Sequence, residues 1–435
     1  MQTATEQDAR TAEEAPPWRL CTRVAFRFCF VYLGLFCLVF AQITFAFAGP
    51  LARWLPEHAV LWQMVLLDPV TRWVGRTVFG TDAALSPDTG SGDQSAIWVL
   101  VFCVLLVALV ATAVWSALDR HRLTYGRLAA WFLVFLRMCL GGQMLFYGFA
   151  KVIPTQMPAP PLAALLERFG DLSPMAVLWL QVGSSHPYEI ALGSVEVAAG
   201  LLLFPPRTAT LGSLLSLAST AQIFLLNMTF DVPVKILSFH LLVMSAVLLA
   251  PQARRLADML IFARPAQPAT QAPLFASAAR NRIAAAVQVA LGVWVLAGCV
   301  TLNVAQWNQY GGGRPKPELY GIWAVTDFTV DGTPRQPVTT DEFRWQRVVF
   351  DAPEVVTYQR MNGDLVDVAA VRSDNTLVLS DVATFTVDRQ ATDRLRLTGR
   401  LEGRPVSISL QRQSLDDFTL LNRGFHWVQE QPFLG

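Results

Sequence analysis

Seven apolar stretches dominate this sequence, and each is about as long as a bilayer is thick. They cover residues 28–47, 97–118, 128–150, 188–204, 209–228, 234–250 and 283–305. An α-helix needs about 20 predominantly apolar residues to cross the hydrocarbon core. With 53% hydrophobic and only 15% charged residues, the chain is also too apolar for an ordinary soluble protein. We therefore predict a mostly α-helical membrane protein with seven transmembrane helices.

The placement of arginine predicts the orientation of these helices. We expect a disordered N-terminus at 1–18. Residues 19–127 are expected to contain two spans that are connected by a long outer loop. If the N-terminus is cytoplasmic, the arginine-rich connections fall on the inner side, as the positive-inside rule requires. These arginines are Arg120, Arg122, Arg127, Arg207, Arg254, Arg255, Arg264, Arg280 and Arg282. An odd number of spans then places the C-terminal domain outside an inner (cell) membrane, in the periplasm or the extracellular space.

The last part of the chain, residues 313–435, has a different pattern. Charged side chains are frequent, and short alternating runs are separated by turn pairs, Asp-Gly at 331–332, Asn-Gly at 362–363 and Glu-Gly at 402–403. About eight strands are expected, which predicts an antiparallel β-barrel or sandwich. Residues 261–282, rich in Ala, Pro and Gln, are the expected linker to the seventh span at 283–305.

Two cations share one face of the third apolar stretch. Arg137 and Lys151 are 14 residues apart, and helical periodicity brings both to the same side. A charge at such a depth costs at least roughly 3 kcal/mol unless it is paired or hydrated. Glu196, about midway along the fourth stretch, is the expected partner of Arg137, and Glu189 lies seven residues earlier on the same face.

Two interpretations of the polar residues in the apolar stretches are open. The candidate intramembrane site consists of Arg137, Glu196, His240, Lys151, Glu189 and Asn227. Functionally, these residues would line a polar or proton-accessible pocket between helices. Structurally, an Arg137–Glu196 pair would fix helix register without a ligand, Lys151 would extend to the head groups, and His240 and Asn227 would form hydrogen bonds between or at the ends of helices.

Several other classes of site have no signal in the sequence. The six cysteines form no CxxC motif, so neither a metal site nor a disulfide scaffold is expected. A haem is not expected either, because His240 is the single histidine within a predicted span and has no spanning axial partner. The net charge of +1 argues against a nucleic-acid partner. Catalytic residues are unknown, and we expect that the chain is not an enzyme on its own.

Spans three to six resemble the DoxX family of bacterial four-helix membrane proteins, over residues 128–260. The matching pieces are Arg137 with GFAK at 148–151, Glu196 in EVAAGLLLFPPRTATLG, and Asn227 with DVPVK at 231–235 and His240. The resemblance implies a four-helix bundle. It further implies an accessory subunit of a membrane redox complex that binds a quinone or another lipophilic ligand in a polar intramembrane pocket.

The start of the C-terminal domain resembles lipocalin-type barrels. Gly321 and Trp323 match the Gly-x-Trp of their first strand, and Arg423 would be the arginine that packs against this tryptophan. This resemblance gives an alternative function, a non-enzymatic, membrane-anchored binding or assembly protein. Its β domain would hold an apolar ligand in an open interior, or dock a membrane or periplasmic protein if the interior is filled. Trp323, Trp345, Phe425, His426 and Trp427 are expected in the barrel core.

Overall fold

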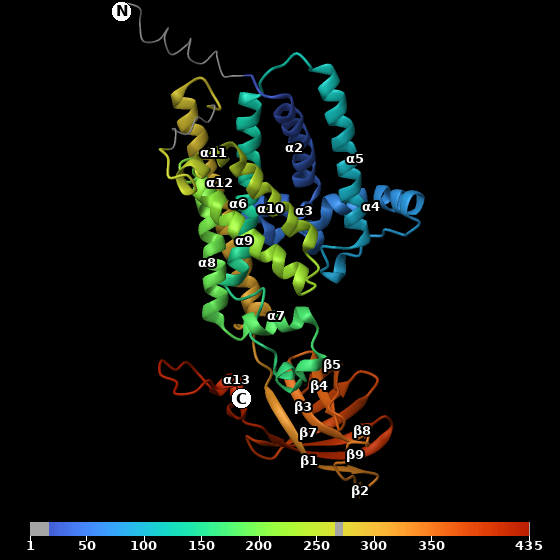
Figure 1. Cartoon of the computed structure of the whole chain (residues 1–435). Coiled ribbons are helices and arrows are strands. Elements are labelled where there is room, and N and C mark those ends of the chain that lie inside the picture. Colours follow the sequence, from blue (N-terminus) through green and yellow to red (C-terminus); the bar gives the residue numbers. More distant parts are fainter. Residues whose placement is uncertain (1–16, 266–272, 435) are drawn as a thin grey trace, which may run out of the picture. The chain divides into compact units, whose positions relative to one another are not determined.

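The computed structural model describes residues 17–265 and 273–434 (Figure 1). The chain forms two compact units. One consists of Met1–Gln156 with Pro187–Gln306 and is helical; the other consists of Met157–His186 with Trp307–Gly435 and contains the β-strands. Residues 1–16 of the predicted disordered N-terminus (1–18) and residues 266–272 of the predicted linker (261–282) lie outside the described residues, whereas Trp18 is ordered and donates its backbone N–H to the carbonyl oxygen of Leu123 at 3.0 Å.

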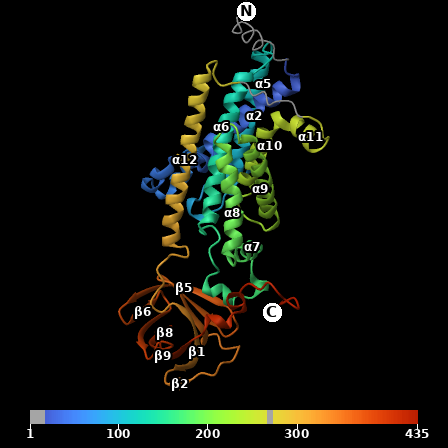
Figure 2. The ribbon, with the colours of Figure 1, turned by 90° about the vertical axis from the view of Figure 1, so that its left-hand side faces the viewer.

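The helical unit is a bundle of long helices with short 3-10 and π turns between them (Figures 1 and 2). Its α-helices are α2 (Leu20–Val39), α3 (Ala41–Phe45), α4 (Trp62–Val74), α5 (Ser95–Leu118), α6 (Gly126–Val152), α8 (His186–Leu203), α9 (Ala209–Thr229), α10 (Lys235–Leu249), α11 (Ala253–Leu260) and α12 (Ala278–Gln309). The short turns are Ala46–Trp54, Glu57–Leu61, Gly75–Phe79, Pro87–Thr89 and Ala250–Gln252.

Within the described residues, six helical segments are long and apolar enough to cross a membrane, which supports a multi-pass membrane protein. They are Leu20–Val39, Ser95–Leu118, Gly126–Val152, Ala209–Thr229, Lys235–Leu260 and Ala278–Gln309. The remaining predicted span, 188–204, is also helical and forms α8, but Glu189 and Glu196 lower its mean hydropathy and it is not among the six.

Glycines let α8 lie against α6 along its length, in antiparallel orientation (Figure 2). A Cβ atom at Gly193 would be 2.6 Å from the carbonyl oxygen of Gly148. Near the other end of α8, a Cβ atom at Gly141 would be 3.3 Å from the Cβ of Leu203. Close backbone approach at small residues is how helices associate in a lipid environment, where burial of apolar surface supplies little drive.

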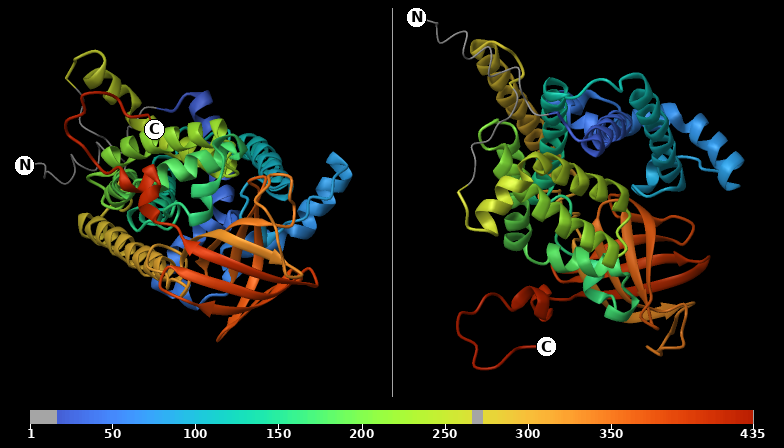
Figure 3. Two further views of the ribbon diagram at one scale, coloured as in Figure 1. Left: turned by 90° about the horizontal axis from the view of Figure 1, so that it is seen from below. Right: turned by 45° about the horizontal axis from the view of Figure 1, so that its top comes forward.

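The second unit contains an antiparallel β-barrel (Figures 1 and 3). Its strands are β1 (Gly321–Val330), β2 (Thr333–Pro334), β3 (Trp345–Ala352), β4 (Val355–Arg360), β5 (Leu365–Ser373), β6 (Thr376–Leu379), β7 (Ala383–Arg389), β8 (Arg394–Leu401) and β9 (Arg404–Arg412). The order is β2-β1-β3-β4-β5-β6-β7-β8-β9, and β1 also pairs with β9. Eight strands therefore close into a barrel, and β2 is a short hairpin partner of β1. The predicted antiparallel β domain is confirmed, and of the two predicted forms the barrel is observed.

The interior of the barrel is a packed aromatic and aliphatic core. The rings of Trp345 and Tyr358 stack with centroids 4.4 Å apart, and Phe385 meets Trp345 edge-on at 5.9 Å. Trp323 is buried in the same cluster and donates its indole N–H to the carbonyl oxygen of Leu319 at 2.9 Å. The predicted core positions of Trp323 and Trp345 are confirmed.

Four sequence assignments in this domain are wrong. Phe425 and Trp427 are 77% and 91% exposed, and His426 is exposed too, because they follow α13 (Thr419–Asn422), beyond the last strand. Arg423 does not fill the expected role beside Trp323; it contacts His426 and Gln429 and lies over the ring of Phe433.

A different arginine reaches the start of the barrel. Arg412, the last residue of β9, pairs in register with Trp323 and donates a hydrogen bond to the carbonyl oxygen of Tyr320 at 2.8 Å. Its guanidinium also lies beside Gly321, whose φ of +146° suits glycine. The register of β1 and β9 places Arg412, and not Arg423, beside Trp323 and Gly321. The sequence pattern did not define this register.

The segment between α6 and α8 packs on the barrel and not within the predicted bundle at 128–260. It contains the 3-10 turns Leu162–Leu166 and Phe169–Asp171 and the helix α7 (Pro174–Gly183). Leu162 packs with Ile322 and Val349, and its backbone N–H donates to the carboxylate of Asp351 at 3.0 Å. This segment therefore belongs structurally to the C-terminal unit.

Candidate intramembrane polar sites

The first polar site is a buried ion pair between α6 and α8. Lys151 Nζ lies 2.9 Å from Glu196 Oε2, and the two side chains are only 7% and 6% exposed. The predicted extension of Lys151 to the head groups is therefore wrong. The predicted Arg137–Glu196 ion pair is also wrong, because Glu196 is engaged by the other cation of the same helix face.

Neutral polar side chains from α3 and α6 form a hydrogen-bonded group that reaches this ion pair at Tyr147. The ring of Tyr147 lies one helical turn before Lys151, with its centroid 5.9 Å from Nζ. Gln42 of α3 donates a hydrogen bond to the hydroxyl of Tyr147, and Gln143 donates to the backbone carbonyl oxygen of Gln42 at 3.0 Å. Sequence reasoning missed Gln42, Gln143 and Tyr147. Gln143 and Tyr147 are not at the seven-residue steps that separate Arg137 from Lys151, so this pattern did not single them out. Gln42 lies in a different helix, α3.

The second polar site contains Arg137, which pairs with an amide rather than a carboxylate. Its guanidinium donates a hydrogen bond to Oε1 of Gln288, on α12. Gln288 is oriented by its own helix, because its Nε2 donates to the carbonyl oxygen of Ala284 at 2.9 Å. Arg137 is only 5% exposed, and its Nε atom has no hydrogen-bond partner within the described part of the chain.

The antiparallel register of α6 and α8 explains why Arg137 cannot reach Glu196. Gly193 packs against Lys151, and Leu203, the last residue of α8, packs against Gly141. Arg137 lies one turn beyond Gly141, where α8 has already ended. At a rise of 1.5 Å per residue, Arg137 and Lys151 are about 21 Å apart along α6. The two cations thus belong to separate sites.

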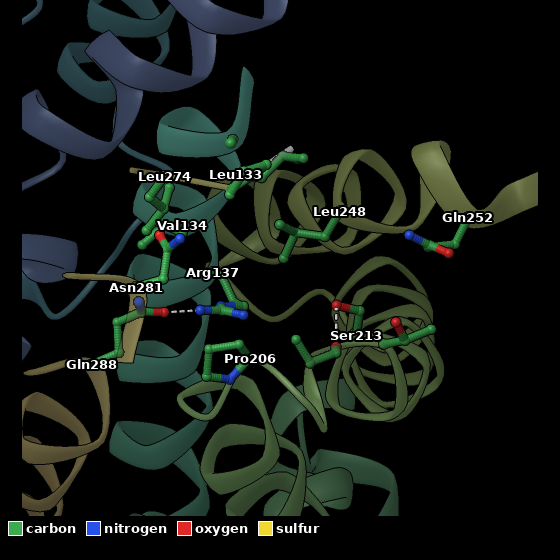
Figure 4. A pocket seen from close by; sticks show the side chains of 14 residues that line it. Leu133, Val134, Arg137, Pro206, Ser213, Leu248, Gln252, Leu274, Asn281 and Gln288 are labelled. Atoms are coloured by element: carbon green, nitrogen blue, oxygen red, sulfur yellow. Dashed lines mark hydrogen bonds between the residues drawn. The ribbon is translucent and has the colours of Figure 1, made fainter. Parts of the chain in front are cut away.

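Arg137 faces a cavity of about 290 Å³ within the helical unit (Figure 4). The cavity is lined by Ala130, Leu133, Val134, Arg137, Pro206, Ala209, Thr210, Ser213, Leu248, Gln252, Pro273, Leu274, Asn281 and Gln288. Figure 4 shows the guanidinium extending from α6 toward Gln288 on one side and toward Pro206 and Ser213 on the other. Among these lining residues, Arg137 is the single charged one. The other lining side chains are apolar or neutral and polar.

His240 and Asn227 have hydrogen-bond partners other than the two cations. His240 forms hydrogen bonds with α2 and with its own helix: Nδ1 donates to the Ile236 carbonyl oxygen at 2.7 Å, and Nε2 lies 2.8 Å from the Tyr32 hydroxyl. Asn227 donates to Ser238 Oγ at 3.1 Å. The hydrogen bonds expected of His240 and Asn227 are therefore present. Glu189 is fully buried in the first turn of α8.

Together these features define a class: a multi-pass helical membrane-type protein with polar sites inside its helical unit and a packed C-terminal β-barrel. A 128-residue stretch is 32% identical to the uncharacterized protein YwoB of Bacillus subtilis (strain 168), covering 27% of this chain and 75% of YwoB. The chain therefore belongs to the family of YwoB. No family model and no solved structure matches the chain.

Proposed function

We propose that this protein binds a lipophilic ligand with a hydrogen-bond-accepting head group in the cavity at Arg137, and that it is not an enzyme on its own. One observation carries the proposal. A guanidinium that is almost fully buried faces a cavity and has a neutral amide as its partner. Polar and ionisable groups inside a membrane are costly, so an unsatisfied one points to a ligand or a transported group.

The cavity suits the head of such a ligand better than a whole lipid. Its volume of about 290 Å³ is at the lower end of the ~300–1,000 Å³ typical of small-molecule pockets. Arginine has five N–H donors, and Gln288 accepts from one nitrogen of the group. Leu133, Leu248 and Leu274 offer an apolar wall to an attached chain. A quinone is one candidate, since its carbonyl oxygens accept hydrogen bonds.

The resemblance to the DoxX family makes the quinone a specific proposal: the chain would be an accessory subunit of a membrane redox complex. This proposal includes α8 as a seventh span, so that α6, α8, α9 and α10 form the four-helix bundle. An 18-residue helix is about 27 Å long, close to the ~30 Å of the hydrocarbon core. Its packing along α6 supports the same depth for both helices. The N-terminus would then be cytoplasmic and the barrel periplasmic or extracellular, with the protein in the inner membrane.

The test is to purify the full chain in mild detergent and to identify lipophilic molecules that remain bound. We expect a bound quinone or other amphiphile that is lost in Ala130→Leu, which fills the cavity and keeps Arg137. The control Gly34→Leu introduces the same leucine side chain on α2, outside this cavity, where nothing lies within 4 Å of the new Cβ atom. An equal ligand content in the wild type and Ala130→Leu, or no bound ligand in either, would contradict the proposal.

The second candidate function is docking of a protein partner by the β domain. The exposed rings of Phe425 and Trp427 favour it, because they lie together with centroids 5.0 Å apart and aromatic residues are enriched at protein interfaces. A photo-crosslinking residue at Trp427 should capture a defined partner in cells, whereas the same residue at Val371, which is also exposed, should not. Equal or absent crosslinking at both positions would contradict this function.

A further inference from the structure

We propose that the ligand at Arg137 carries an oxyanion head group, a phosphate or a carboxylate, attached to an apolar chain. This inference rests on the proposed function and names the chemical class of its ligand. It requires a negative charge where the proposed function requires only hydrogen-bond acceptors.

The first argument is the missing counter-charge. Arg137 is only 5% exposed, yet no Asp or Glu is found among the described lining residues of the cavity. Other buried cations of the helical unit have a carboxylate nearby. Lys151 meets Glu196 directly, and Arg27 binds the hydroxyl of Tyr125, which in turn donates to Asp119 at 2.8 Å. Since a buried cation is stable only when its charge is compensated, the ligand is the expected source of that charge at Arg137.

The second argument is the free geometry of the guanidinium. Gln288 is fixed by the carbonyl oxygen of Ala284 and takes one terminal nitrogen of Arg137. The Nε atom is left without a partner, and it is part of the fork with which arginine binds carboxylates and phosphates through two parallel hydrogen bonds. The planar arrangement of donors therefore matches an oxyanion more closely than a single carbonyl oxygen.

The third argument is the charge around the cavity. Several lining residues are followed or flanked by arginine: Pro206 by Arg207, Gln252 by Arg254, and Asn281 by Arg280 and Arg282. Basic residues at this kind of position attract the anionic head groups of the cytoplasmic leaflet. The apolar wall of the cavity would in turn favour an amphiphile over a free inorganic anion.

The experiment compares four probes on the full chain in nanodiscs or detergent. The probes are phosphatidylglycerol, a long-chain fatty acid, inorganic phosphate and an uncharged decyl-quinone, and bound molecules are counted by native mass spectrometry. We expect phosphatidylglycerol or the fatty acid to bind, with an affinity about ten- to a hundred-fold lower in Arg137→Gln. Arg137→Lys should recover part of the affinity, since it restores the charge but not the fork.

Two further variants separate this effect from misfolding. Arg264→Gln removes an exposed arginine that follows α11 and does not line the cavity, and it should leave binding unchanged. Ala130→Leu keeps the charge, fills the cavity, and should abolish binding of the amphiphile.

Each outcome decides a different statement. Binding of the amphiphiles but not of inorganic phosphate supports the anionic amphiphile, whereas tight binding of inorganic phosphate, lost in Arg137→Gln, overturns the amphiphile in favour of a free anion. Binding of decyl-quinone alone, lost in Ala130→Leu, overturns the oxyanion and leaves the proposed function standing. Failure of all four probes overturns both. Unchanged amphiphile binding in a folded Arg137→Gln variant also overturns the inference.

Discussion

Replacement of Glu196 by glutamine should destabilise the helical unit more than any exposed charge removal. The substitution keeps the size of the side chain but removes the charge that faces Lys151 at 2.9 Å. Both side chains are almost fully buried, so water cannot take over the role of the carboxylate.

The magnitude follows from the geometry. At 2.9 Å and an effective dielectric constant of about 20, two unit charges attract each other by about 6 kcal/mol. Desolvation of both ions offsets much of this attraction, which is why a buried pair can add little net stability. Removal of one partner leaves the desolvation cost of the other uncompensated, and the expected loss is about 3–5 kcal/mol of unfolding free energy.

The assay is unfolding of the full chain in mixed micelles by titration with SDS, followed by circular dichroism. The matched control is Asp231→Asn. Its ion pair with Lys235 is equally short at 2.8 Å, but Asp231 is 83% exposed, so a loss of about 0–1 kcal/mol is expected. The double variant Lys151→Met/Glu196→Gln should recover most of the stability lost in Glu196→Gln, because it leaves no unpaired charge.

A loss below about 1 kcal/mol for Glu196→Gln, equal to that of the exposed control, would refute the reasoning. It would mean that Lys151 finds another compensating group or reaches water. A double variant as unstable as the single one would show that the loss comes from packing and not from charge.

Three further predictions concern the packing, the barrel and the topology. Gly193→Ala should lower the free energy of unfolding by about 1–3 kcal/mol, because its Cβ atom would lie 2.6 Å from the carbonyl oxygen of Gly148. The control Gly34→Ala, with nothing within 4 Å of its Cβ atom, should cost nothing. Equal unfolding free energies of the two variants would contradict the α6–α8 packing. Burial alone would raise the pKa of Asp341, but two backbone N–H groups and the Arg335 guanidinium at 2.8 Å lower it overall. The contribution of the ionised Asp341 to stability is therefore complete above about pH 4 and is lost as the pH falls further. The melting temperature of Asp341→Asn should depend less on pH, between about 5 and 2.5, than that of the wild type. With seven spans, a reporter fused to the C-terminus should be active outside the cytoplasm and one at the N-terminus inside; reporters on the same side would contradict α8 as a span.

The sequence contained enough information for the elements but not for their contacts. Hydropathy depends on residues that follow one another, so six of the predicted spans could be located, and alternation with turn pairs was enough to predict the β domain. The same local signals could not distinguish a barrel from a sandwich, which depends on the pairing of β1 with β9 across the whole domain.

The candidate site shows the same limit more clearly. That Arg137, Lys151 and Glu196 lie inside apolar helices, and that a buried cation needs compensation, could be deduced from the sequence alone. Which of the two cations meets Glu196 could not be deduced, because it depends on the register between α6 and α8. Glycine contacts set this register, and α6 ends at Val152, 34 residues before α8 begins at His186. Gln288, the observed partner of Arg137, is further still, on α12.

The sequence by itself thus determined that the chain has membrane-type helices, a β domain and buried charges. Only the tertiary structure decided how the charges are distributed: one ion pair between Lys151 and Glu196, and one arginine left facing a cavity. The physical reason is that hydropathy and periodicity are properties of a single segment, whereas charge compensation depends on distances between segments, and these are fixed only when the helices pack.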